Sequence, residues 1–226
     1  CRRFMNNEHT LIGNNGLTIG DLASFWQAIA KEFSTFKNIY GYGLMNEPHD
    51  LAPETKWFDM AQASINAIRE VDTNTLIMVG GNDWSSAERW IEQSDTLKFL
   101  KDPANNLAFE AHVYFDKDAS GTYKYSYEEE ECYPEKGIDR VKPFVEWIKQ
   151  NKFHGFIGEY GIPDNDPRWN ETLDLFLGYL QENGINGTYW AAGPWWDSYF
   201  MAITPKDGKD RPQMPIIEKY TSTLKK

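Results

Sequence analysis

The chain has 226 residues, 41% of them hydrophobic, which is enough for a substantial core in one large domain or two small ones. Its formal net charge of −11 argues against nucleic acid or an anionic membrane surface as a partner. No apolar run approaches the roughly 20 residues of a membrane span, and no hydrophobic signal segment opens the chain.

Helix and strand signals alternate along the chain. The first predicted helix has Asp21 as its N-cap and one apolar face made of Leu22, Phe25, Trp26, Ile29 and Phe33. The second has its apolar stripe at Trp57, Met60, Ala61, Ile65 and Ile68. The predicted helices cover 54–70, 138–150, 169–182 and a segment after Pro212, with a broken helical region over 85–100. Buried strands are predicted over 39–45, 75–80, 107–114, 154–159 and 186–192.

This alternation predicts a fold of the α/β class. Strands that begin about every 35 residues leave room for a strand and a crossover helix in each unit. Since no glycine-rich phosphate loop follows any strand, a nucleotide-binding doubly wound sheet is disfavoured and a (β/α)8 barrel of the TIM type is favoured.

The number of predicted strands does not close such a barrel. Five of eight strands are found, so the chain is expected to be truncated at its N-terminus, with on the order of 70 to 100 residues upstream. The start of the chain is expected to be the loop after a strand. Residues 1–226 are then a single catalytic-domain portion, made of the carboxyl-terminal βα units of the barrel.

Two predicted strands end at a glutamate. The apolar run before Asn46-Glu47-Pro48 stops at Glu47, because a proline cannot join a strand ladder. The strand that contains Ile157 and Gly158 likewise ends at Glu159. Catalytic groups of a TIM barrel lie at the carboxyl ends of its strands, so these two carboxylates are a candidate acid/base pair. Each glutamate taken alone could also cap a helix or pair with a surface lysine.

Four motifs at successive strand ends resemble the family five glycoside hydrolases, especially the β-1,4-endoglucanases. The motifs are Asn46-Glu47-Pro48, His112-Val113-Tyr114, Gly158-Glu159-Tyr160-Gly161 and Trp190. The resemblance covers essentially the whole chain. It implies hydrolysis of internal β-1,4-glucosidic bonds in cellulose or related β-glucans, without a cofactor or a metal ion, by a secreted or extracellular enzyme.

The resemblance also implies a role for each of these residues. Glu47 is the acid/base and Glu159 the nucleophile of a retaining mechanism, in which the two carboxyl groups lie roughly 5 Å apart. Asn46 binds the sugar 2-hydroxyl. His112 lines the cleavage subsite and Tyr114 holds the nucleophile, and their alternation with Val113 turns both to one side of a strand.

Aromatic residues make up 15% of the chain, and ring faces suit the C–H faces of sugars, although most tryptophans fill a core or its rim. The family places a tryptophan at the position of Trp190 as the floor under the sugar. Trp84, Trp195 and Trp196 follow strands and could extend a groove or pack at its rim. The acidic run 128–131 is expected to be a solvated loop and not a calcium site, because it lacks the spacing and glycine of an EF-hand.

Several alternatives stay open. The family's arginine and histidine near the nucleophile would lie upstream of Cys1, so activity of this chain alone is not implied. A β-mannanase or xylanase on the same scaffold, or a non-catalytic carbohydrate-binding fragment, is also consistent with the sequence. An exposed sheet edge at the 39–45 strand would promote self-association. For Cys1 and Cys132, two free thiols are a plainer interpretation than a disulfide.

Overall fold

The computed structural model describes residues 2–5, 8–196 and 198–221. The strands are β1 (Arg2–Met5), β2 (Glu8–Leu11), β3 (Gly41–Gly43), β4 (Leu76–Gly80), β5 (Leu107–His112), β6 (His154–Tyr160) and β7 (Asn186–Tyr189). The helices are α1 (Ile19–Phe33), α2 (Trp57–Arg69), α3 (Asn82–Ser85), α4 (Trp90–Ser94), α5 (Lys136–Asn151), α6 (Arg168–Glu182) and α7 (Met214–Thr221), with 3-10 helices η1 (Asp95–Phe99) and η2 (Pro194–Trp196). Cys1, and with it the prediction about a Cys1–Cys132 disulfide, lies outside the described residues.

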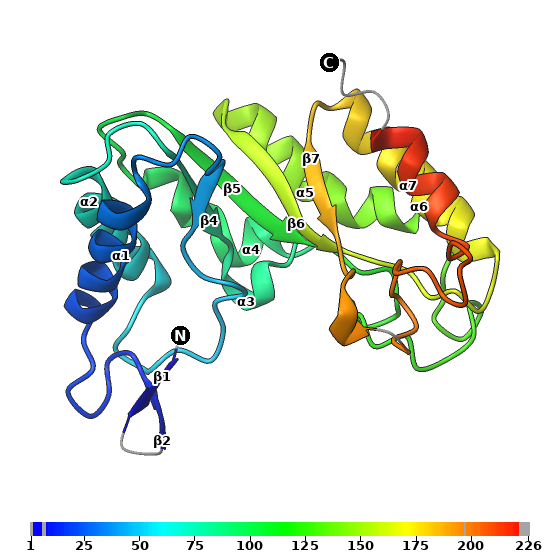
Figure 1. Cartoon of the computed structure of the whole chain (residues 1–226), viewed down its shortest axis with the longest axis horizontal. Helices are drawn as coiled ribbons and strands as arrows, with labels where there is room; N and C mark the ends of the chain where they lie inside the picture. Colours follow the sequence, from blue (N-terminus) through cyan, green and yellow to red (C-terminus); the bar gives the residue numbers. More distant parts are fainter. Residues whose placement is uncertain (1, 6–7, 197, 222–226) are drawn as a thin grey trace. The chain divides into compact units, whose positions relative to one another are not determined.

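Five strands form one sheet in the order β3-β4-β5-β6-β7, which is also their order along the chain (Figure 1). The pairs β3–β4, β4–β5 and β6–β7 are parallel. Helical segments connect the successive strands, as parallel pairing requires. The predicted alternation of strands and helices is therefore confirmed.

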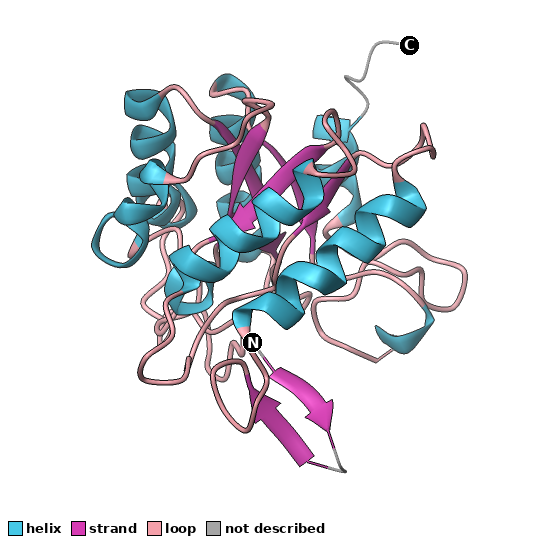
Figure 2. Cartoon of the chain, turned by 90° about the vertical axis from the view of Figure 1, so that its left-hand side faces the viewer, coloured by secondary structure: helices cyan, strands magenta, loops and turns pink. Residues whose placement is uncertain are grey.

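The start of the chain differs from the prediction of a loop. β1 and β2 form an antiparallel hairpin in which Arg2 lies opposite Leu11 and Met5 opposite Glu8. Figure 2 shows this hairpin as a separate two-stranded ribbon, and neither strand joins the five-stranded sheet. Four-residue strands of mixed polarity carry too little alternation to be recognised from sequence.

The chain divides into two compact units. The first unit contains Cys1–Glu110 and Trp147–His154, and the second contains Ala111–Glu146 and Gly155–Lys226. The prediction that 1–226 form one catalytic-domain portion stays a prediction. The paragraphs below treat each unit by itself.

The first helix begins one turn earlier than predicted. Thr18 is the N-cap, because its hydroxyl accepts the Asp21 N–H at 3.2 Å while the Asp21 carboxylate accepts the Thr18 N–H at 2.7 Å. This reciprocal pair is a capping box with Asp in the N3 place that Glu or Gln usually takes. Prediction of Asp21 as the cap was therefore wrong. On the predicted apolar face Leu22 is buried, but Phe25 remains 55% exposed.

Helix α2 supplies the core of the first unit. All five residues of its predicted stripe are buried, which confirms that stripe. α2 packs beside α1 (Figure 1). An aromatic cluster lies under β5, where the Trp147 ring meets Phe109 at 4.9 Å and Trp90 at 5.4 Å, both edge to face. Since each ring buries a large apolar area, this cluster is a main source of hydrophobic stabilisation.

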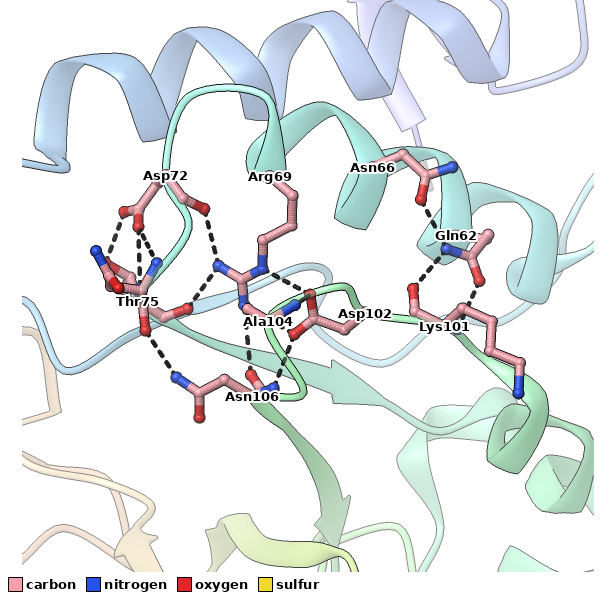
Figure 3. A network of polar contacts seen from close by, with 10 residues as sticks. Gln62, Asn66, Arg69, Asp72, Thr75, Lys101, Asp102, Ala104 and Asn106 are labelled. Carbon is pink, nitrogen blue, oxygen red and sulfur yellow. Dashed lines mark hydrogen bonds and ion pairs between the residues drawn. The ribbon is translucent and has the colours of Figure 1, made fainter.

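A polar network ties together the amino ends of β4 and β5 (Figure 3). Arg69, at the end of α2, donates through Nε and Nη2 to the two carboxylate oxygens of Asp102 at 2.7 and 3.0 Å. Its Nη1 donates to the carbonyls of Asp72 and Thr75 at 3.0 and 2.9 Å. Although burial opposes ionisation, the bonds from Arg69 and from the Asn106 backbone lower the pKa of Asp102. This buried bidentate ion pair stabilises the amino ends of β4 and β5. In a TIM barrel that end of the strands serves stability, whereas the carboxyl end carries the catalytic groups.

Three strands of the sheet are shorter than predicted. β3 covers only Gly41–Gly43 of the predicted 39–45, because the Ile39 N–H is used in a turn with the Phe36 carbonyl. β5 ends at His112 and β7 at Tyr189, before the predicted ends at 114 and 192. Apolar sequence thus continues past the last regular strand pairing in each case.

The second unit has its core between α6 and the strand ends. Phe176 of α6 meets Phe115 at 5.2 Å and Tyr160 at 5.3 Å. The 128–131 acidic run is only partly solvated, since Glu130 is 3% exposed and accepts the N–H groups of Lys117 and Tyr125. The expectation of a wholly solvated run was therefore wrong at Glu130, where the carboxylate organises the loop instead.

Among the described residues, every helix is too short or too polar to cross a bilayer.

Candidate active site

Asn46 and Glu47 follow the first strand of the parallel sheet. β3 ends at Gly43, and the Leu44 N–H still donates to the Met78 carbonyl of β4 at 3.0 Å. Asn46 is exposed and Glu47 half-buried. Glu47 has a φ of +45°, a left-handed conformation that costs a residue other than glycine on the order of 1–3 kcal/mol. Both residues therefore lie past the carboxyl end of β3, as the sequence predicts.

The segment around Glu47 is packed tightly on the end of β4. Trp57 Nε1 donates to the Gly80 carbonyl at 2.7 Å. A Cβ on Gly80 would lie 3.0 Å from the Met45 carbonyl oxygen and 3.5 Å from the Pro48 ring. A side chain at this position would push these neighbours away, so glycine allows the backbone on either side of Glu47 to approach β4 this closely.

Trp84 stands in the loop after β4 and stacks on His49, with ring centroids 4.5 Å apart and an interplanar angle of 15°. The Trp84 side chain is 43% exposed. Asp83, Trp84 and Ser85 all have φ between +53° and +56°, so this turn is strained. An ion pair of Asp83 with Arg89 and burial of Ser85 hold it in place. Trp84 follows β4 as predicted, but it lies within the short α3, where its φ and ψ are not helical. Its part in sugar binding stays a prediction.

Glu159 lies at the next-to-last position of β6 and contacts Tyr114, which the family resemblance pairs with it, and also His112. The Tyr114 hydroxyl donates to Glu159 Oε2 at 2.8 Å, and His112 Nδ1 lies 3.6 Å from the same oxygen. The intervening Val113 N–H donates to the Glu159 carbonyl at 3.0 Å. His112 and Tyr114 thus turn to one side, and the backbone pairing between them sets their distance from the carboxylate.

Tyr114 is a proton donor in this pair. Its burial, together with the charge of Glu159 and the hydrogen bond to it, raises the pKa of Tyr114 far above the ordinary value of 10.0. The phenol therefore stays protonated and acts as the hydrogen-bond donor to the Glu159 carboxylate. Hydrogen bonds of this kind stabilise the charged form of the acceptor.

Trp190 follows β7 directly and does not lie within it. Regular pairing of β7 ends at Tyr189, after a register shift against β6, although the Trp190 N–H still donates to the Tyr160 carbonyl at 2.8 Å. A Cβ on Gly161 would lie 2.4 Å from the Trp190 carbonyl oxygen, so only glycine permits this approach. The Trp190 ring meets Trp196 edge to face at 4.9 Å.

The loop after Trp190 adds an aromatic residue that the sequence analysis missed. Tyr199 packs on Trp196 at 4.9 Å, and burial together with the charge of Glu159 raises the pKa of Tyr199. Trp195 is 93% exposed and is the more accessible of the two loop tryptophans. Tyr199 has no motif of its own, and only its spacing of three residues from Trp196 could have indicated that the two rings meet.

The second unit therefore brings His112, Tyr114 and Glu159 together, with Trp190 after the neighbouring strand. Asn46 and Glu47 lie in the first unit, after β3. Their pairing with Glu159, and the roles of all six residues, stay predictions.

A family model described as Cellulase (glycosyl hydrolase family 5) matches residues 4–195. The chain belongs to glycosyl hydrolase family 5. The resemblance seen in the four strand-end motifs is thereby confirmed, and so is the α/β fold of the TIM-barrel type, of which five strands are described in this chain.

Known members of family 5 are similar to the chain over most of its length. Endo-beta-1,4-glucanase B of Emericella nidulans is 36% identical over 193 residues, which are 83% of this chain and 56% of that protein. The structure of Pseudomonas stutzeri endoglucanase Cel5A in complex with cellobiose is 41% identical with a TM-score of 0.87, and the match covers 96% of this chain and 64% of that one. The structure of XacCel5A in complex with cellopentaose is 38% identical with a TM-score of 0.83, over 92% of this chain and 68% of the other. The chain spans little more than half the length of the curated relative.

Proposed function

We propose that this family 5 chain carries the catalytic carboxylates of a retaining endo-β-1,4-glucanase that cleaves internal bonds of cellulose or related β-glucans. The observation that supports this most is the arrangement at β6. A half-buried Glu159 accepts a hydrogen bond from a tyrosine that cannot ionise at neutral pH, and a buried histidine lies beside the same oxygen.

Glu159 is the nucleophile of the proposed mechanism. Its carboxylate attacks the anomeric carbon, a glycosyl–Oε bond forms and the bond to the leaving sugar oxygen breaks. The attack needs an ionised carboxylate with a fixed lone pair. Donation from Tyr114 to Glu159 Oε2 at 2.8 Å favours the ionised form of the carboxylate.

Glu47 is the acid/base of the proposed mechanism. It gives its proton to the leaving oxygen in the first step and takes a proton from the attacking water in the second, which restores both glutamates. Retention of configuration requires the two carboxyl groups roughly 5 Å apart. A crystal structure of the full-length protein with that separation would support retention, whereas a separation near 9 Å would indicate inversion.

The proposed substrate is a β-glucan chain. In this proposal Asn46 holds the 2-hydroxyl of the sugar at the cleaved bond, and the Trp190 ring stacks on that sugar. Structures of relatives with cellobiose and cellopentaose favour glucan over mannan or xylan. A secreted location and self-association through the β3 edge belong to the same proposal.

Hydrolysis of carboxymethyl cellulose by the full-length protein tests this function. Viscosity that falls faster than reducing ends appear indicates internal cleavage. Glu159→Gln and Glu47→Gln should each lower kcat by about 10²- to 10⁴-fold, while Glu182→Gln at the exposed end of α6 should leave it unchanged. Faster cleavage of mannan or xylan would show that the proposed substrate is wrong. Binding of cellulose without cleavage would favour a non-catalytic binding fragment over an enzyme.

A further inference from the structure

The hydroxyl of Tyr123 lies between the strand exits that carry Tyr114 and Glu159. It accepts the Phe115 N–H at 2.9 Å and donates to the Gly161 carbonyl at 2.6 Å. Phe115 directly follows Tyr114, and Gly161 is two residues beyond Glu159. Tyr123 itself is buried.

This hydroxyl occupies the place of a strand-pairing hydrogen bond. The last direct bond between the two exits runs from the Val113 N–H to the Glu159 carbonyl. In a parallel ladder the next bond in the same direction joins residues two positions further on each strand, here the Phe115 N–H and the Gly161 carbonyl. The Tyr123 oxygen stands between those two groups, so it satisfies both of them and sets how far the exits separate.

The loop 116–123 holds this hydroxyl rigidly. The buried Asp116 carboxylate accepts the backbone N–H groups of Gly121, Thr122 and Tyr123 at 3.0, 3.0 and 3.3 Å. The Tyr123 ring packs edge to face on Trp169, with centroids 5.0 Å apart. The same loop lies against the nucleophile's partner, because a Cβ on Gly121 would come within 3.0 Å of the ring of Tyr114.

We infer that Tyr123 is a positioning residue for the Tyr114–Glu159 pair. Its hydroxyl holds the two strand exits at the separation at which the Tyr114 hydroxyl reaches Glu159 Oε2. The inference rests on the proposed role of Glu159 as nucleophile.

Loss of the hydroxyl would leave two buried backbone groups without their partner. The exits would then close on each other or admit water, and either change moves Tyr114 relative to Glu159. A displacement of about 1 Å at a reacting group can cost on the order of 10²-fold in rate. Substrate affinity would change little, since Tyr123 is only 8% exposed.

The chain offers a matched control in Tyr127. This tyrosine is also buried, lies in the same loop region and packs edge to face on Trp169 at 4.7 Å. Its hydroxyl meets Thr172 Oγ1 of α6 at 3.0 Å and touches neither strand exit. Tyr127→Phe therefore removes a buried hydroxyl of the same kind without the proposed positioning role.

The test uses an activated 2-deoxy-2-fluoro-cellobioside, which labels a nucleophilic carboxylate covalently, on the full-length protein. In Tyr123→Phe we expect labelling and kcat to fall by about 10- to 100-fold with KM within about twofold. The acid limb of its kcat/KM profile should move to higher pH, because the ionised carboxylate is less well stabilised. Tyr127→Phe should keep the wild-type rate and profile, and melting temperatures of both variants show that they are folded.

The outcomes separate the inference from the proposed function. Tyr123→Phe with the rate and pH profile of Tyr127→Phe, in a protein whose Glu159→Gln variant is not labelled, would overturn the positioning role alone. A loss in Tyr123→Phe with an unmoved acid limb would also overturn it, because that is a purely structural effect. Wild-type protein that is never labelled, or is labelled at a residue other than Glu159, would overturn the proposed function and this inference with it.

Discussion

At the scale of single residues, the candidate site depends on which side chains keep their protons. Tyr114 remains a phenol because burial and the neighbouring carboxylate raise its pKa, so the hydrogen bond to Glu159 has a fixed direction. The family resemblance implied this partnership, whereas the spacing of His112 and Tyr114 predicted only that both turn to one side of a strand. Spacing could not predict Tyr123, whose two partners are backbone groups that only the folded strand exits bring together.

Tyr114→Phe should lower kcat by roughly 10- to 100-fold, because a hydrogen bond to a charged group contributes about 1.5–3 kcal/mol. The expected change is in kcat on a soluble cello-oligosaccharide, with the acid limb of the pH profile moved upward. Tyr220→Phe is the matched control, since the Tyr220 hydroxyl also meets a carboxylate, that of Asp174, on α6. Equal activity of the two variants would argue against a role for Tyr114 at the nucleophile.

Trp84→Ala should raise KM for cellopentaose by about 5- to 10-fold and leave kcat nearly unchanged. The Trp84 ring is exposed, and its loss would remove one stacking surface of about 1 kcal/mol. Tyr40→Ala is the control, because Tyr40 is 68% exposed but precedes β3, at the end away from Glu47. A KM that is unchanged in Trp84→Ala would assign this ring to packing on His49 alone.

At the scale of elements, the spacing of hydrophobic residues predicted where helices and strands lie, but it did not predict caps and turns. The α2 stripe and the strand at β4 follow from apolar spacing, which burial enforces. The start of α1 was missed because the Thr18 cap depends on a reciprocal bond with Asp21. The left-handed turn at Asp83 and Trp84 lies before the broken helical region predicted over 85–100, and no residue pattern in the sequence indicated it.

Breaking the ion pair between Arg69 and Asp102 should destabilise the fold strongly. Both side chains are at most 4% exposed, so Arg69→Met leaves a buried carboxylate without its partner and should lower the free energy of unfolding by about 3–5 kcal/mol. Arg168→Met is the control, because Arg168 is 44% exposed and its pairs should contribute about 0–1 kcal/mol. Urea denaturation measures both. Similar losses in the two variants would contradict the stabilising role of the network in Figure 3.

Asp72 should make stability depend on pH in the acid range. Burial opposes its ionisation, but bonds from Thr75 and Asn74 lower the pKa of Asp72 from 3.8 to about 2. Because its pKa is lower in the folded protein, ionised Asp72 stabilises the fold at pH values above its ordinary pKa of 3.8. This stabilisation is lost as the pH falls through about 2. Wild-type protein should therefore lose on the order of 2 kcal/mol more than Asp72→Asn between about pH 4 and pH 2. Parallel pH dependences in the two proteins would contradict this assignment.

At the scale of the whole molecule, the order of the strands matters more than their exact bounds. Each predicted parallel strand exists, and the sheet order equals the chain order. Catalytic groups of a TIM barrel follow the carboxyl ends of its strands, and the prediction that the strand-end motifs form one site rests on that rule. Within the described residues β3 pairs with β4 alone, as the prediction of an edge strand requires.

The central claim is the division of labour between Glu47 and Glu159, and azide rescue of alanine variants in the full-length protein tests it most directly. With an activated aryl cellobioside, Glu159→Ala should be inactive until azide attacks from the vacated face and gives a glycosyl azide of inverted configuration. Glu47→Ala should still form the glycosyl-enzyme, because a good leaving group needs little protonation, and azide should then give the retained product. Opposite stereochemistry in the two variants would exchange the roles of the glutamates, and normal activity of both on cello-oligosaccharides would contradict the hydrolase assignment.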